Sequence, residues 1–156
     1  MEKVQVMSIY HDSVVDGEGL RTVIFFAGCP HKCEGCHNPE SWNPCNGKSM
    51  TVEEILEEAL NPLTQITLSG GDPFYQARSV KKIAKELKRH GKNIWAYTGW
   101  TLEEIKNSKD LDKVELLEYV DVLVDGPFLL SERDLTLTFR GSRNQRIIKL
   151  REESLT

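Results

Sequence analysis

The sequence predicts an α/β fold built on an open, mostly parallel sheet, and three observations lead to that class. Short apolar runs alternate along the chain with amphipathic helical patterns, which is the arrangement of βαβ units. The 156 residues are near the commonest domain size and no repeat or linker divides them, so one domain over residues 1–156 is expected. A closed eight-stranded (βα) barrel needs about 250 residues. The chain is therefore expected to form only a partial (βα) barrel.

The first half of the chain alternates strand and helix patterns. KVQVMSI alternates apolar and polar residues, and RTVIFFAG is an apolar run typical of a strand that is buried on both faces. A helix is expected in TVEEILEEAL, because Thr51 can cap its first turn while Glu54 reaches back, and Asn61 and Pro62 end it. QITLSGGDP predicts a strand that runs into a glycine turn.

The second half continues this alternation. A helix is predicted from about residue 76 to 90, with apolar residues on one face and Gly91 as its C-terminal cap. Thr101 and Glu104 repeat the capping pattern before a helical stretch that is expected to break near Ser108. NIWAYTG, YVDVLVDGP and QRIIKL are predicted strands. The apolar positions of the longer helix are Ala77, Val80, Ile83, Ala84 and Leu87.

Unusual residues gather in the loops that follow four of these strands. The strands fall at about residues 22–27, 65–69, 93–97 and 121–124. In parallel sheets, ligands collect at the carboxyl ends of the strands. The cysteine loop, SGGDP, YTGW and VDGPF are therefore expected to face one site. Its candidate ligand-binding residues are Ser69, Gly70, Gly71, Asp72, Thr98 and Asp125.

Charge and hydropathy argue against nucleic acid and membranes as partners. A formal net charge of −4 disfavours sequence-independent binding of nucleic acid, which requires many contacts from Lys and Arg to phosphate. The N-terminus lacks the pattern of a secretory signal, and TVIFFAGC is too short to cross a bilayer. A cytoplasmic location without membrane contact is therefore expected, and clustered cysteines there indicate metal binding or redox chemistry more than disulfides.

Three cysteines lie within eight positions of the segment GCPHKCEGCHN. Pro30 and Gly35 predict that Cys29, Cys33 and Cys36 lie in a loop, and three thiolates leave one coordination position of a metal centre for a small molecule. Two alternatives remain from the residues alone. One is a zinc-binding interaction module completed by His31, His37 or Cys45, and the other is an electron carrier with Cys45 as the fourth ligand.

The C-x3-C-x2-C loop after a strand resembles the radical S-adenosylmethionine enzymes. This resemblance implies that Cys29, Cys33 and Cys36 hold a [4Fe-4S] cluster, whose fourth iron is chelated by S-adenosylmethionine. It also implies a partial barrel of the radical S-adenosylmethionine type, and binding of the methionyl amino group by SGGDP. Further cofactor contacts are expected from Gly35, Cys36 and His37, the last as a candidate to lie against the adenine. Asp125 is expected either to meet ribose hydroxyls or to form a turn.

Five further segments narrow the resemblance to the glycyl-radical-enzyme activating proteins, and within them to the activators of anaerobic ribonucleoside-triphosphate reductase. The segments are DGEGLRTVIFFAGC, CHNPESW, WAYTGW, VDVLVDGPF and FRGSRNQRI, and the likeness runs from about residue 5 to 150. It implies an oxidoreductase that cleaves S-adenosylmethionine to a 5′-deoxyadenosyl radical and takes hydrogen from a glycine of the reductase. A low-potential donor such as flavodoxin or ferredoxin would supply the electron. Another glycyl-radical enzyme, such as pyruvate formate-lyase, is the alternative partner.

Other residues allow a structural and a functional interpretation. Trp95 and Tyr97 are expected to be core or sheet-face aromatics, and Cys45 to be a free thiol or a temporary ligand. A basic run near the C-terminus is expected to be a solvated face or a docking site for a partner. It consists of Arg140, Arg143, Arg146, Lys149 and Arg151.

Overall fold

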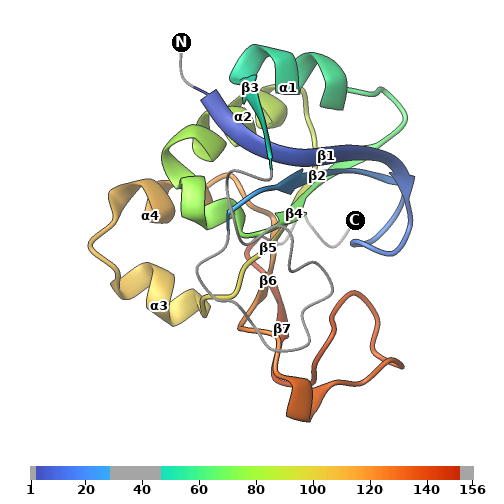
Figure 1. The fold of residues 1–156 in the computed structure, drawn as a ribbon, viewed down its shortest axis with the longest axis vertical. Helices are drawn as coiled ribbons and strands as arrows, with labels where there is room; N and C mark the ends of the chain where they lie inside the picture. The colour runs from blue at the N-terminus through green and yellow to red at the C-terminus, as the bar shows by residue number, and fades with distance from the viewer. Residues whose placement is uncertain (1–2, 29–46, 152–156) are drawn as a thin grey trace.

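The computed structural model describes residues 3–28 and 47–151 and shows a mixed α/β fold around one seven-stranded sheet (Figure 1). The strand order is β3-β1-β2-β4-β5-β6-β7. The strands are β1 (Lys3–Ser13), β2 (Arg21–Phe26), β3 (Lys48–Thr51), β4 (Gln65–Gly70), β5 (Ile94–Tyr97), β6 (Val122–Asp125) and β7 (Arg146–Lys149). The helices are α1 (Val52–Ala59), α2 (Ala77–Arg89), α3 (Leu102–Asn107) and α4 (Leu111–Leu117), with short 3₁₀ turns at Pro73–Gln76 and Leu130–Glu132.

The middle of the sheet is parallel, as the sequence predicts. β2 pairs with β4, β4 with β5 and β5 with β6, all in parallel register. The flanking strands are antiparallel, because β1 forms a hairpin with β2 and β7 returns along β6. The sheet is open, with β3 and β7 at its two edges. An α/β fold with an open sheet that is parallel in its middle is thus confirmed, whereas the three outer pairings are antiparallel and the partial-barrel type stays a prediction.

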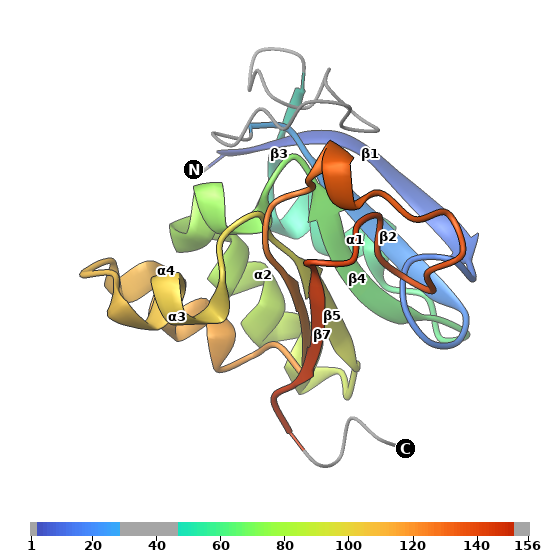
Figure 2. The same cartoon turned by 90° about the horizontal axis from the view of Figure 1, so that it is seen from below.

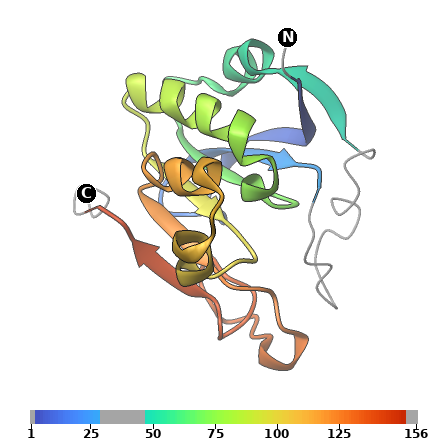
Figure 3. The same ribbon diagram turned by 90° about the vertical axis from the view of Figure 1, so that its left-hand side faces the viewer.

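The helices cover one face of the sheet, while the segment after β6 lies on the other face (Figures 2 and 3). The main core lies between helices and sheet, and includes Ile24 and Leu68 from the strands with Ile83 and Leu87 from α2. A smaller cluster on the opposite face contains Trp95, Val122 and Val124, with Phe139 packed against it. None of the helices in the described ranges is long and apolar enough to span a bilayer.

The predicted helix caps are all present. Thr51 and Thr101 each accept a hydrogen bond from the backbone of the residue three positions later, and the glutamate there bonds back to the cap. Gly91 ends α2 in the left-handed conformation, at φ 74°. The Gly91 N–H donates to Lys88 O and the Lys92 N–H to Leu87 O, which is the two-bond Schellman arrangement.

Two elements go beyond the sequence prediction. Lys48–Thr51 forms a strand against β1, although Met50 is its only strongly apolar residue, and backbone pairing with Lys3–Val6 stabilises it. The helical stretch from residue 101 does break at Ser108, as predicted, and a separate helix follows because the Asp110 side chain accepts hydrogen bonds from two backbone N–H groups of α4.

Candidate functional site at the carboxyl edge of the sheet

Hydrogen bonds join the loops after β4, β5 and β6 to one another and to Gly28, the last described residue after β2. The Gly71 N–H donates to Phe26 O at 2.7 Å and the Asp72 N–H to Gly28 O at 2.9 Å, so the glycine turn holds the chain just before the cysteine loop. On the other side, the Thr98 N–H donates to Val124 O at 3.0 Å. The loops after β4, β5 and β6 therefore meet at one edge together with Gly28, while the position of the cysteine loop and a common ligand site stay predictions.

Gly70 allows this close approach between β4 and β2. Its φ is 107°, and a Cβ built there would lie 2.2 Å from the backbone nitrogen of Phe26. Such a contact is impossible for a side chain, and the positive φ is a conformation that glycine adopts without strain. The requirement for glycine at this position thus has a packing origin that is independent of any ligand.

Asp72 connects the glycine turn to the loop after β5. Its carboxylate is fully buried. One oxygen accepts the Phe74 N–H at 2.9 Å, and the other accepts the Thr98 hydroxyl and the Gly99 N–H, both at 2.9 Å. These contacts give Asp72 and Thr98 a clear role in positioning the two loops, and their contact with a cofactor stays a prediction.

Asp125 holds the beginning of α3 and the end of the segment after β6. The carboxylate is buried, accepts the Leu102 N–H at 2.7 Å, and forms a bidentate pair with Arg146 at 3.0 and 2.5 Å. Hydrogen bonds from Arg146 to Asp125 and Glu103 raise the pKa of the guanidinium. The alternative of a structural turn thus has direct support, and a ribose contact stays a prediction.

The basic run at the C-terminus contains mostly structural arginines. Arg143 pairs with Glu132, Arg140 donates to Gln145 O, and Arg151 donates to the carbonyls of Glu118 and Val120 just after α4. Together with the Arg146 pair, these contacts support a fold-stabilising interpretation, while docking of a partner on this run stays a prediction.

A cavity of about 630 Å³ lies beside Ser69 and Gly70 on the sheet face opposite the helices. Its walls come from residues 14–16, from the strands, and from the segment 128–145. The apolar lining residues are Val14, Val15, Phe25, Phe128, Leu137 and Phe139. Predominantly apolar walls with a few polar groups are typical of sites that bind small molecules. Ser69 and Gly70, the last two residues of β4, therefore lie where they can contact a bound ligand.

Tyr97 and Phe139 form one wall of this cavity, which the sequence does not reveal. The Tyr97 hydroxyl donates to Phe139 O at 2.7 Å, and burial raises the pKa of this phenol. Phe139 has φ 64°, unusual for a residue with a side chain, and its ring meets Trp95 edge-on at 5.2 Å. The prediction that Trp95 and Tyr97 are sheet-face aromatics is confirmed, whereas the strand alternation gives no sign that Tyr97 lines a cavity.

The metal-binding prediction falls outside the described residues. Cys29, Cys33 and Cys36 lie there, as do Gly35, His37 and the alternative ligands His31 and Cys45. Within 3–28 and 47–151, no group of three or more His, Cys, Asp or Glu side chains is placed to hold a metal ion. The described chain does bring Gly28, directly before Cys29, to the carboxyl edge, where Asp72 binds its carbonyl.

Comparison with known proteins identifies the family. Residues 15–148 match the family model of the 4Fe-4S single cluster domain. The anaerobic ribonucleoside-triphosphate reductase-activating protein of Enterobacteria phage T4 is 38% identical over 149 residues, covering 89% of this chain and 90% of the relative. Those of Haemophilus influenzae and Escherichia coli K12 are each 34% identical, covering 89% and 91% of this chain and 94% and 96% of the relatives. The chain therefore belongs to the family of anaerobic ribonucleoside-triphosphate reductase-activating proteins, which carry a 4Fe-4S domain.

Proposed function

We propose that this chain activates an anaerobic ribonucleoside-triphosphate reductase by forming a glycyl radical on it. A bound [4Fe-4S] cluster would receive one electron from a low-potential donor such as flavodoxin or ferredoxin. This electron would cleave S-adenosylmethionine to methionine and a 5′-deoxyadenosyl radical, and the radical would take a hydrogen atom from a glycine of the reductase. The family membership and the geometry of the carboxyl edge support this proposal.

The donor set agrees with such a cluster. Cys29, Cys33 and Cys36 would supply three thiolates, the ligand type of iron–sulfur clusters, and leave one iron for the cofactor. The observation that carries the proposal is that Gly28, immediately before this loop, is bonded to the Ser69–Asp72 turn beside the apolar cavity. A cluster held after Gly28 would thus adjoin a cavity able to take a ligand.

The chain's own residues would orient the cofactor and exclude water. Gly71 and Asp72 fix the distance between the glycine turn and the entry of the cysteine loop, while the apolar side chains of the cavity keep solvent from the reacting groups. Direct contact with S-adenosylmethionine is proposed for Gly35, Cys36, His37, Ser69, Gly70, Gly71, Asp72, Thr98 and Asp125. The open sheet suggests how a loop of the reductase could reach this cavity.

Anaerobic reconstitution with iron and sulfide tests the proposal. The reconstituted chain is mixed with S-adenosylmethionine, a reductant and the reductase, and the products are 5′-deoxyadenosine and a glycyl radical measured by electron paramagnetic resonance. Cys29→Ala, Cys33→Ala or Cys36→Ala should abolish 5′-deoxyadenosine formation, whereas Cys45→Ala should have little effect.

The same experiment separates the alternatives. Zinc without iron or sulfide would indicate a zinc-binding module, and loss of the cluster in Cys45→Ala would indicate a simple electron carrier. A radical formed on pyruvate formate-lyase, and none on the reductase, would identify a different glycyl-radical enzyme as the partner.

A further inference from the structure

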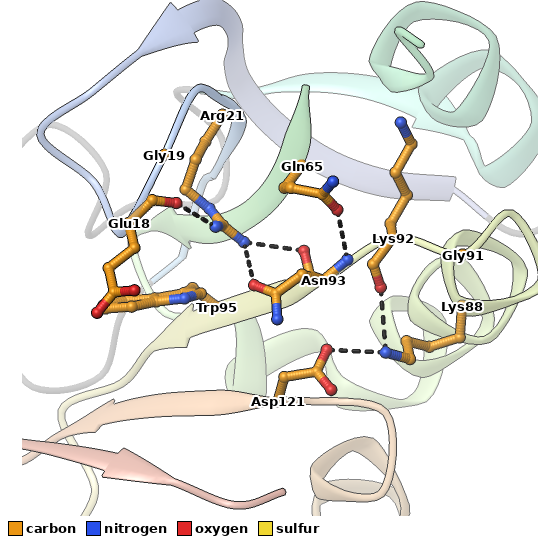
Figure 4. A pocket seen from close by; sticks show the side chains of 10 residues that line it. All are labelled: Glu18, Gly19, Arg21, Gln65, Lys88, Gly91, Lys92, Asn93, Trp95 and Asp121. Atoms are coloured by element: carbon orange, nitrogen blue, oxygen red, sulfur yellow. Dashed lines mark hydrogen bonds and ion pairs between the residues drawn. The ribbon is translucent and has the colours of Figure 1, made fainter. Parts of the chain in front are cut away.

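A second cavity, of about 480 Å³, lies at the amino ends of the parallel strands (Figure 4). It is separate from the carboxyl-edge site, because its lining residues precede or begin the strands whose far ends form that site. Its lining residues are Glu18, Gly19, Arg21, Gln65, Lys88, Gly91, Lys92, Asn93, Trp95 and Asp121. Nothing in the proposed activation reaction uses this cavity.

The Arg21 guanidinium in its wall is buried, and within residues 3–28 and 47–151 it donates hydrogen bonds only to uncharged acceptors. The side chain is 1% exposed. It donates to the Thr67 hydroxyl, to the carbonyls of Glu18, Ile66 and Asn93, and to the side-chain oxygen of Asn93. Burial is the main cause that lowers its pKa, to about 10. At neutral pH the group still carries its charge, in surroundings that screen it weakly.

Lys92 is a second buried cation, but its ammonium group points away from the cavity toward Asn61 and Thr64, while its carbonyl faces Lys88 (Figure 4). Lys92 is 8% exposed, and its ammonium group donates to the carbonyls of Asn61 and Thr64, both at 2.7 Å. Within the described residues, neither Lys92 nor Arg21 forms an ion pair with a carboxylate. Among the described residues, both cations thus donate hydrogen bonds to neutral acceptors, and Asp121 and Glu18 act on Arg21 only through space.

The remaining charges of the lining do not fully cancel those of Arg21 and Lys92. Lys88 pairs with Asp121 at 2.8 Å, and the same carboxylate accepts the Ile94 N–H. Glu18 is then the one carboxylate of the lining outside that pair. The carbonyls at the end of α2, which would repel an anion, accept hydrogen bonds from His90, Gly91 and Lys92. The lining residues therefore carry one positive charge in excess, and this excess comes from Lys92, whose ammonium group lies behind the wall.

Two side-chain amides offer hydrogen-bond donors on the wall where Arg21 lies. The Gln65 side-chain oxygen accepts the Asn93 N–H at 2.7 Å, and the Asn93 side-chain oxygen accepts from Arg21 at 2.9 Å. With both oxygens used in this way, each amide keeps its NH₂ group for other partners. Figure 4 shows Arg21, Gln65 and Asn93 side by side on this wall, with Lys88 and Asp121 on the other.

We propose that this cavity is an oxyanion-binding site, which takes inorganic phosphate or the phosphate group of a nucleotide. The amides of Gln65 and Asn93 would donate to the oxygens, while Arg21 and Lys92 supply positive potential from behind. This site does not depend on the cysteine loop or on S-adenosylmethionine, so its test stands apart from the test of the activation reaction.

Equilibrium dialysis of the anaerobically reconstituted chain against radiolabelled inorganic phosphate tests the site. Saturable binding of one phosphate per chain is expected, and unlabelled ATP is added to compete. Competition by ATP at lower concentration than by unlabelled phosphate identifies a nucleotide as the ligand, and the reverse order identifies free phosphate. Absence of saturable binding at millimolar phosphate would overturn the proposal.

Two charge variants test the location of the site. Gln65→Glu retains an acceptor for Asn93 N–H but brings a negative charge into the cavity, and should weaken phosphate binding about tenfold. Glu18→Gln removes a negative charge and should tighten binding about threefold. Asn107→Asp and Glu57→Gln make the same charge changes at exposed positions away from the cavity, and should leave binding unchanged. Equal affinity in Gln65→Glu and Asn107→Asp would exclude this cavity as the site.

Discussion

Replacing Gly70 with alanine is expected to remove a large part of the stability of the fold. The new Cβ would lie 2.2 Å from Phe26 N and 2.5 Å from Phe26 O. Because ordinary nonbonded contacts are near 3.5 Å, β2 and β4 would have to separate by about 1 Å. That movement also strains the 2.7 Å hydrogen bond from Gly71 N to Phe26 O, and with it the entry of the cysteine loop.

The magnitude follows from three contributions. Overpacking between two backbones costs about 1–3 kcal/mol, a side chain at positive φ about 1–2 kcal/mol, and a weakened hydrogen bond about 1 kcal/mol. A total loss of about 4 kcal/mol is a large share of the 5–15 kcal/mol typical of a domain. For a chain of this size it should lower the Tm by about 10 °C.

Gly91→Ala provides the matched control. Gly91 also has a positive φ, of 74°, but no atom lies within 4 Å of a Cβ built there. The substitution should therefore cost only the conformational strain, about 1–2 kcal/mol. Thermal unfolding followed by circular dichroism measures both variants. If Gly70→Ala and Gly91→Ala lower the Tm equally, the close contact between β4 and β2 is not the reason that position 70 requires glycine.

Two further predictions concern hydrogen bonds. Tyr97→Phe removes the hydrogen bond to Phe139 O and should destabilise the segment after β6 by about 1 kcal/mol. Tryptic cleavage after Arg140 should then be about fivefold faster than in the wild type. Tyr10→Phe, at an exposed position, is the control, and equal cleavage rates in the two variants would show that the Tyr97 bond does not hold the segment. Hydrogen bonds within the first capping box lower the pKa of Glu54, so its ionised form stabilises the fold at neutral pH and this contribution is lost as pH falls through the lowered pKa. The stability difference between wild type and Glu54→Gln, measured by urea unfolding, should therefore shrink toward pH 3, and a constant difference would contradict this.

The sequence predicts those parts of the fold that depend on short segments. The capping boxes at Thr51 and Thr101 and the glycine cap at Gly91 are visible because the residues that interact lie within four positions of each other. The parallel order of the central strands follows from their alternation with helices. The meeting of the loops at one edge follows from that order alone.

The partners of the buried carboxylates could not be predicted, because they are distant in sequence. Asp72 meets Thr98 and Gly99, and Asp125 meets Arg146, only after the strands are arranged in the sheet. From the sequence, both carboxylates are equally good ligands for a cofactor. The structure adds that each already connects two elements of the fold.

The segment 126–145 could not be predicted for a different reason. It has no helical or strand periodicity, and its shape depends on side chains that bond to its own backbone. Gln145 accepts from Gly141 N–H and Ser142 N–H and donates to Gly126 O, and Asn144 donates to Pro127 O. Such bonds give no pattern in the sequence, so the wall that this segment contributes to the cavity emerges only from the fold.

Mössbauer spectroscopy of the ⁵⁷Fe-reconstituted chain, with and without S-adenosylmethionine, is the most direct test of the central claim that three cysteines leave one iron open. The account predicts that one of the four irons changes its isomer shift when S-adenosylmethionine is added, while the other three keep theirs. Four irons that all stay unchanged in excess S-adenosylmethionine would show that protein side chains occupy every position, and would contradict the account.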